Sequence, residues 1–243
     1  TRHELTYYRE FGERYAANVV LVLFFTGTDF RNNMAATRAT VRAGCLVPTY
    51  KHNKFEGVLE RHCRLFAYLR REVRHTWLGK EVLAPLGMVK LAYPQHVSML
   101  KRDYSDREWL AVRETEAALD GFTRLASERQ SRFVLCIIPD KLQVQGDYLA
   151  EYTKSLGGVD SYDPDKPSKV LEGICRDLSV DCIDLLPASR YLFGQGERLY
   201  LDGDIHWSER GRQLLSKVLA EELLALNRTA DGYKTAVNVE SDA

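Results

Sequence analysis

Runs of β-branched and aromatic side chains most constrain the fold of this chain. Val19–Phe25 ends at Gly27-Thr28-Asp29, and Arg132–Ile138 stops before a proline. Continuous apolar runs of this length, bounded by Gly, Pro or Asp, are typical of strands buried on both faces. A third strand is expected at Val180–Leu186. Helical patterns lie between these strands, and the alternation predicts a parallel α/β sheet with helices on both faces.

Several helices are expected around these strands. Apolar residues at close to helical spacing, among them Leu5 and Phe11, predict an amphipathic helix from Thr1 to about Ala16. Ser105-Asp106-Arg107-Glu108 is a capping box, in which the Ser and Glu side chains satisfy each other's free backbone N–H groups. It opens a long helix whose inward face is expected to contain Trp109, Val112, Ala117 and Leu125.

The C-terminal third is expected to contain two more helices. After the second strand, a mobile polar stretch is expected up to Asp165. Pro167 then suits the first turn of a short helix that reaches about Leu178. The final helix should run from Glu209 to about Leu226, and residues 231–243 should form a polar, frayed tail. The stripe of that final helix consists of Leu215, Val218, Leu219, Leu223 and Leu226.

Composition narrows the classes of function. Lys+Arg and Asp+Glu both total 34, so the formal net charge is zero, which argues against a nucleic-acid partner. Val19–Phe25 is far too short to span a bilayer, which takes about 20 residues. The five cysteines form no CxxC pair, and their odd number argues against a disulfide scaffold. Cys136, inside an apolar run, is interpreted as a small buried thiol.

A basic helix is expected at Phe55–Trp77. Its apolar face is flanked by five arginines, and the plainest interpretation is a solvated basic face. The alternative is contact with a membrane surface or an acidic ligand.

Asp204 and His206 form the strongest candidate for chemistry. They lie two residues apart on a short loop that opens the final helix. His206 would accept a proton from a hydroxyl nucleophile, and Asp204 would hold the ring in the productive tautomer. One alternative is that Asp204 and Ser208 only cap the helix. Another is a metal bound by Asp202, Asp204 and His206.

The order of segments resembles the SGNH/GDSL hydrolases, also called GDSL-like esterases, and covers most of the chain outside the insertion between residues 32 and about 104. The Asp-x-His-Trp element also looks like the variant in polysaccharide O-acetyltransferases of that superfamily. The resembling pieces are Tyr7-Tyr8-Arg9-Glu10-Phe11-Gly12 leading to Val19–Phe25 and Gly27-Thr28-Asp29; Ile138-Pro139-Asp140-Lys141; Pro167 through Asp184-Leu185-Leu186-Pro187; and Asp204-Ile205-His206-Trp207 with Gly211.

The resemblance implies a fold and a set of roles. The fold would be a three-layer α/β/α domain over residues 1–230 with a flavodoxin-like parallel sheet. The activity would be hydrolysis of acyl esters or acyl transfer, with His206 as the base and Asp204 as its orienting carboxylate. The substrate would be a small-molecule or glycan acyl ester of the O-acyl carbohydrate or lipid type, and no metal or organic cofactor is implied.

The sequence departs from the family pattern in two ways. The family nucleophile is a Ser in a Gly-Asp-Ser element after the first strand, and no such element occurs here. We therefore expect that strand to precede Thr1, so that this chain is a piece of a longer protein and inactive by itself. Thr28 stands where the family has an Asn that donates to the oxyanion; Thr28, helped by Gly27, would substitute for it or weaken activity. The alternatives are a non-catalytic binding module on a degenerate hydrolase fold and a metal-dependent phosphoesterase.

Overall fold

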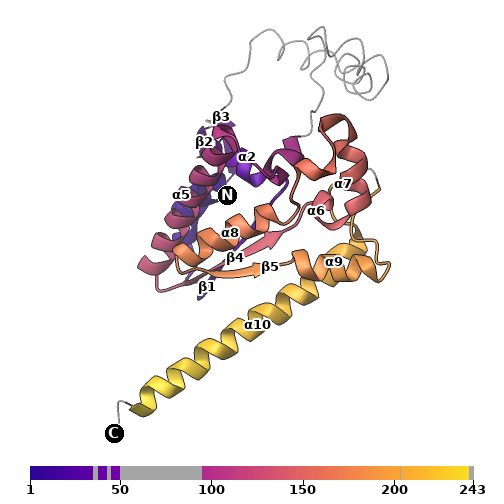
Figure 1. The fold of residues 1–243 in the computed structure, drawn as a ribbon. Helices are drawn as coiled ribbons and strands as arrows, with labels where there is room; N and C mark the ends of the chain where they lie inside the picture. Colours follow the sequence, from indigo (N-terminus) through magenta and orange to yellow (C-terminus); the bar gives the residue numbers. More distant parts are fainter. Residues whose placement is uncertain (35–37, 43–44, 50–94, 203, 241–243) are drawn as a thin grey trace. The chain divides into compact units, whose positions relative to one another are not determined.

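A computed structural model describes residues 1–34, 38–42, 45–49, 95–202 and 204–240 of the chain (Figure 1). It contains two compact units, residues 1–35 with 96–243 and residues 36–95. In the second unit, β2 (Arg38–Arg42) and β3 (Cys45–Thr49) pair as an antiparallel hairpin. The basic helix expected at Phe55–Trp77 lies outside the described residues.

The first unit is built on a parallel sheet. Its strands are β1 (Val19–Phe25), β4 (Arg132–Ile138) and β5 (Asp181–Asp184), in the order β1-β4-β5. β1 and β4 pair over their full length, with Val19 opposite Arg132 and Phe25 opposite Ile138. The three predicted strands are therefore present, and the third is shorter than the predicted Val180–Leu186.

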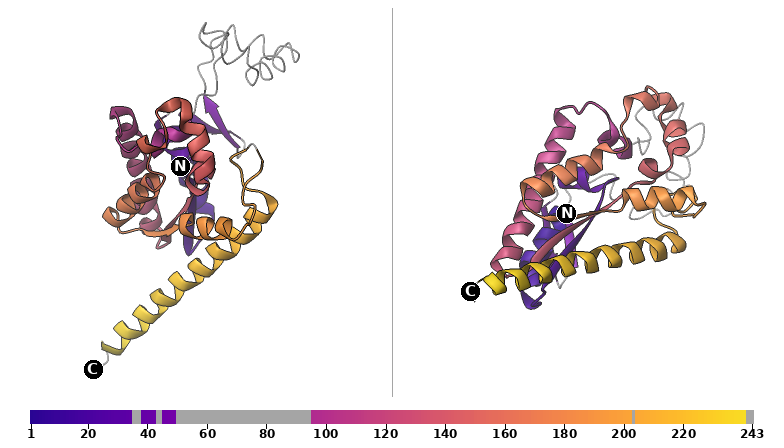
Figure 2. Two further views of the ribbon diagram at one scale, coloured as in Figure 1. Left: turned by 45° about the vertical axis from the view of Figure 1, so that its right-hand side comes forward. Right: turned by 60° about the horizontal axis from the view of Figure 1, so that its bottom comes forward.

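One face of the sheet is covered by a group of helices (Figure 2). They are α1 (Arg2–Phe11), α2 (Asp29–Met34), α5 (Asp106–Glu128) and α8 (Lys166–Asp177). α1 stops earlier than the predicted Ala16, and a 3₁₀ turn, η1 (Gly12–Arg14), follows it. Asn33, fully buried, joins three of these helices, because it accepts from the N–H of Arg2 and donates to Thr115, both at 2.9 Å. The core on this face contains Leu5, Phe24, Phe30, Leu119, Phe122, Leu135, Ile137 and Leu171.

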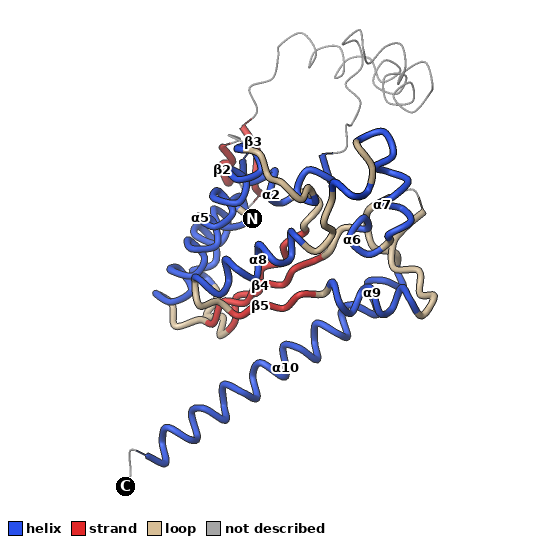
Figure 3. The backbone as a smooth tube through the Cα atoms, in the orientation of Figure 1, coloured by secondary structure: helices blue, strands red, loops and turns tan. Residues whose placement is uncertain are grey.

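The opposite face is covered by α10 (Glu209–Glu240), with α9 (Leu186–Gly194) at one end, so that the strands lie between two layers of helices (Figure 3). α10 continues well beyond the predicted end at Leu226. Its predicted stripe is confirmed, because all five side chains pack in the cluster around Val134, Cys136 and Ile183. Burial raises the pKa of the Cys136 thiol to about 12, as expected for a core cysteine. The fold is the predicted three-layer α/β/α arrangement.

β1 is less buried than its apolar sequence predicted. Val22 and Phe24 are in the core, but 46% of Leu23 and 38% of Val19 are exposed on the other face. The physical reason is position: β1 lies at an edge of the described sheet, and α10 packs over β4 and β5. The expectation of burial on both faces is correct for β4 and wrong for β1.

The capping box of α5 is confirmed, since the N–H of Ser105 donates to the Glu108 carboxylate at 3.0 Å. Its predicted inward face is half wrong. Val112 is buried and Leu125 partly buried, whereas Ala117 is exposed and Trp109 is 46% exposed. The buried face of the helix differs from the predicted one and includes several small side chains. Its buried residues are Ala111, Thr115, Ala118, Leu119, Phe122 and Ala126.

The stretch predicted to be mobile and polar is organised as short helices. After β4 come α6 (Lys141–Val144), α7 (Gly146–Thr153), η4 (Lys154–Leu156) and η5 (Val159–Ser161). They pack with η3 (Gln95–Leu100) around a separate core of Val97, Leu100, Leu142, Leu149 and Tyr162. Across the described part of the chain, no helix combines the length and the apolar character needed to cross a membrane.

Candidate functional site

The loop that carries Asp204 and His206 lies in the segment between α9 and α10. Its two sides are joined by an antiparallel bridge between Tyr200 and Trp207, and the N–H of Leu201 donates to the carbonyl of His206 at 2.9 Å. Ser208 ends the loop and caps α10, because its hydroxyl accepts from the N–H of Gly211 at 2.9 Å. The loop therefore enters the helix at a fixed place.

Asp204 and His206 are in direct contact. Oδ1 of Asp204 lies 2.6 Å from Nδ1 of His206 and also accepts from the His206 backbone N–H at 3.1 Å. These two hydrogen bonds hold the pKa of Asp204 below its ordinary value of 3.8, because they favour the charged carboxylate. An ionised carboxylate only accepts hydrogen bonds, so in the neutral imidazole the shared proton resides on Nδ1 and the lone pair is on Nε2.

The two alternative roles can be compared with this geometry. Ser208 does cap α10, as the capping interpretation expected, but Asp204 binds His206 instead of a helix N-terminus. Asp202 forms an ion pair with Arg198. Within the described residues, no three His, Cys, Asp or Glu side chains are grouped so that they could hold a metal ion.

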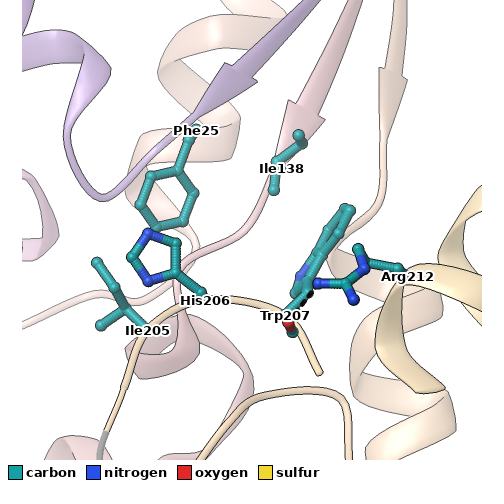
Figure 4. Close-up of a pocket in the computed structure, with 6 residues that line it drawn as sticks. All are labelled: Phe25, Ile138, Ile205, His206, Trp207 and Arg212. Atoms are coloured by element: carbon teal, nitrogen blue, oxygen red, sulfur yellow. Dashed lines mark hydrogen bonds between the residues drawn. The ribbon is translucent and has the colours of Figure 1, made fainter. Parts of the chain in front are cut away.

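His206 lines a pocket at the carboxyl end of the sheet (Figure 4). The pocket has a volume of about 360 Å³, within the range of small-molecule sites. Its walls come from the last residues of β1 and β4, from the loop and from the first turns of α10. The residues that line it are Phe25, Ile138, Ile205, His206, Trp207 and Arg212.

The side chains around His206 are mostly apolar. In Figure 4 the ring of Phe25 lies beside the imidazole, and Trp207 stands across the pocket near Arg212. A guanidinium N–H of Arg212 donates to the carbonyl of Trp207 at 3.5 Å. Sequence reasoning assigned no role to these walls. The only available signal was that Phe25 and Ile138 end parallel strands, where sites of such sheets gather.

Gly27 and Thr28, predicted to bind the oxyanion, are not among the residues that line this pocket. Gly27 lies against Asp140, since a Cβ on Gly27 would stand 2.2 Å from a carboxylate oxygen of Asp140. Thr28 precedes Asp29, whose pKa is raised by burial. The positive charge of the N-terminus and hydrogen bonds, among them those from the Phe25 N–H and from Thr28, partly offset that rise. The oxyanion role of Gly27 and Thr28 stays a prediction.

The ends of β1 and β4 and the Asp204–His206 loop are joined by hydrogen bonds at this edge of the sheet. Thr26 accepts from the N–H of Asp140 at 3.0 Å, which joins the end of β1 to the end of β4. The hydroxyl of Tyr200 donates to the carbonyl of Pro139 at 2.9 Å, which joins the Asp204–His206 loop to the same place.

A model of a known family matches residues 99–242, more than half of the chain, and its description is "SGNH hydrolase-like domain, acetyltransferase AlgX". The chain belongs to this family. No curated protein and no solved structure gives a significant match. The family match includes β4, β5, α10 and the Asp204–His206 loop, and it begins after Gly27 and Thr28.

Membership of the SGNH-like family establishes the general role of the domain, which is acyl transfer or hydrolysis. The predicted superfamily is thereby confirmed.

Proposed function

We propose that this domain supplies the general base for hydrolysis or transfer of acyl esters of the O-acyl carbohydrate or lipid type, through a serine nucleophile. His206 is the base and Asp204 its orienting carboxylate. The observation that carries this proposal is the 2.6 Å contact between His206 Nδ1 and Asp204 Oδ1 at the edge of an apolar pocket.

In this proposal the proton follows a simple route. Nε2 of His206 takes the proton of the attacking hydroxyl as its oxygen bonds to the acyl carbon, and then delivers it to the oxygen of the leaving alcohol. Asp204 stabilises the transient imidazolium and is not protonated. The apolar walls formed by Phe25, Ile138 and Trp207 would hold the acyl group away from water, which strengthens the electrostatic interactions in the site.

The serine itself is proposed to come from outside these 243 residues. No serine lines the pocket in the described parts of the chain, and the sequence contains no Gly-Asp-Ser element. β1 lies at an edge of the described sheet, where a further strand of the whole protein could pair with its backbone.

The test uses the whole protein with p-nitrophenyl acetate as substrate. We expect His206→Ala to reduce kcat by about 10²–10⁴-fold, the usual contribution of general acid–base catalysis. His3→Ala, on α1, is the matched control and should keep the activity of the unmodified protein. Turnover that survives His206→Ala would exclude His206 as the base.

Two other functions are separated by the same assay. A non-catalytic binding module is supported by Thr28 and by the missing Gly-Asp-Ser element, and it predicts binding of acyl esters without turnover in the whole protein. A metal-dependent phosphoesterase would lose its activity in EDTA, whereas our proposal expects EDTA to have no effect.

A further inference from the structure

Lys141 is a buried lysine next to the candidate site. It is the first residue of α6, directly after β4, and only 6% of it is exposed. Lysines are rarely buried to this extent unless their charge is compensated, because removing an ammonium from water is costly. Its contacts therefore indicate what the charge does in this position.

The ammonium of Lys141 binds the loop that carries Asp204 and His206. Nζ donates to the carbonyl of Leu201 at 2.9 Å and to the carbonyl of Asp204 at 3.3 Å, and it lies 4.7 Å from the ring centre of Tyr148. The charge also acts on the Asp202 carboxylate of the same loop, whose pKa it helps to lower, but the described portion of the chain shows no ion pair between Lys141 and a carboxylate. The charge is thus directed at two backbone carbonyls of one turn, and one of them belongs to Asp204 itself.

The backbone at Lys141 is held in place by hydrogen bonds of the neighbouring residues. Asp140 caps α6, since its Oδ1 accepts from the N–H of Leu142 at 2.8 Å, and Gln143 accepts from the N–H of Asp140 at 3.1 Å. The carbonyl of Pro139 in turn accepts from Tyr200. Because the Lys141 backbone is fixed at the end of β4, its ammonium holds the loop at a fixed place relative to that strand.

We propose that Lys141 is a positioning residue, which holds Asp204 in register with His206 by clamping the carbonyls of Leu201 and Asp204. The inference rests on the proposed function of the Asp204–His206 pair. Without the ammonium, both carbonyls would turn to water, and the Asp204 carboxylate would no longer hold the proton on Nδ1. Displacement of a catalytic group by about 1 Å can cost roughly 100-fold in rate.

The first measurement needs neither substrate nor nucleophile. The ¹⁵N shifts of the His206 ring, assigned with His206→Ala, report the tautomer of the neutral imidazole. We expect the Nδ1–H form to dominate in the unmodified chain and to lose its dominance in Lys141→Met, together with faster hydrogen exchange at the Leu201 amide. Lys166→Met is the matched control, because Lys166 also donates to a carbonyl (Arg102) and lies over a tyrosine (Tyr104), neither of which lines the pocket.

If Lys141→Met does not fold, Lys141→Gln is measured in the same way, since its shorter, uncharged amide cannot reach both carbonyls. An unchanged tautomer with unchanged Leu201 exchange in a folded variant would overturn the proposal.

Kinetics of the whole protein separate the two proposals. We expect Lys141→Met to reduce kcat about 10- to 100-fold with KM within about twofold, because the ground-state pocket walls are intact. Full activity in His206→Ala would refute the proposed function, yet the tautomer measurement would still test Lys141. Loss of activity in His206→Ala with normal kcat in Lys141→Met would refute the role of Lys141 alone.

Discussion

Gly211 gives the sharpest test of how the Asp204–His206 loop is packed on α10. A Cβ on Gly211 would stand 2.1 Å from the carbonyl oxygen of Leu199, where ordinary van der Waals contact begins at about 3.4 Å. The position of this Cβ is fixed by the helix backbone, and the oxygen belongs to the backbone of the fully buried Leu199. Neither atom can therefore rotate away. Gly211→Ala must therefore push the start of the loop away from the helix by about 1 Å.

The cost follows from this displacement. Overpacking of this kind costs about 1–3 kcal/mol. The same movement weakens the hydrogen bond from the N–H of Ser208 to the carbonyl of Leu199, 2.9 Å long, which contributes about 0.5–1.5 kcal/mol. The better helix propensity of Ala returns up to about 1 kcal/mol. We expect a net loss of about 2 kcal/mol, or a Tm lower by about 4–8 °C.

The assay is thermal or denaturant unfolding of the whole chain, with Gly173→Ala as the matched control. Gly173 lies inside α8, and a Cβ there meets no atom within 4 Å. That substitution should stabilise the protein by about 0.4–1 kcal/mol, because it reduces only the entropy of the unfolded chain. If Gly211→Ala were as stable as Gly173→Ala, the close approach of Leu199 to α10 would be refuted.

Two further predictions concern the core and the pH dependence of stability. Phe24→Ala removes a fully buried ring that packs edge-on against Phe30 at 4.9 Å, and it should cost about 3–5 kcal/mol in denaturant unfolding; a loss below 1 kcal/mol would contradict the packing. Burial raises the pKa of Asp29 above its ordinary 3.8, so the native state holds more protons than the unfolded chain between 3.8 and the raised pKa, and stability falls as pH rises through that window. Asp29→Asn should flatten this fall, and an unchanged slope above pH 3.8 would refute it.

Most of the fold could be predicted because its signals are local. The strand runs and the stripe of α10 each depend on side chains within one segment. The strands are indicated by β-branched runs bounded by Gly, Pro or Asp, and the helix by its period. The inward face of α5 was harder to predict, because a large apolar residue such as Trp109 is the usual choice for a core position. In the structure the small residues Ala111, Ala118 and Ala126 are buried instead. The segment from α6 to η5 was missed because its core is shared with η3, some forty residues or more away along the chain.

Part of the candidate site could likewise be predicted from local sequence, and part of it could not. The contact between Asp204 and His206 joins residues two positions apart, so the acid-x-His spacing and a turn suffice to predict it. The pocket beside His206 needs Phe25 and Ile138, which come from strands far away in the chain, and the clamp by Lys141 spans about sixty residues. Only the tertiary structure decided these, because a buried ammonium or an apolar wall has no sequence pattern. Its place depends on which strand ends meet at one edge of the sheet.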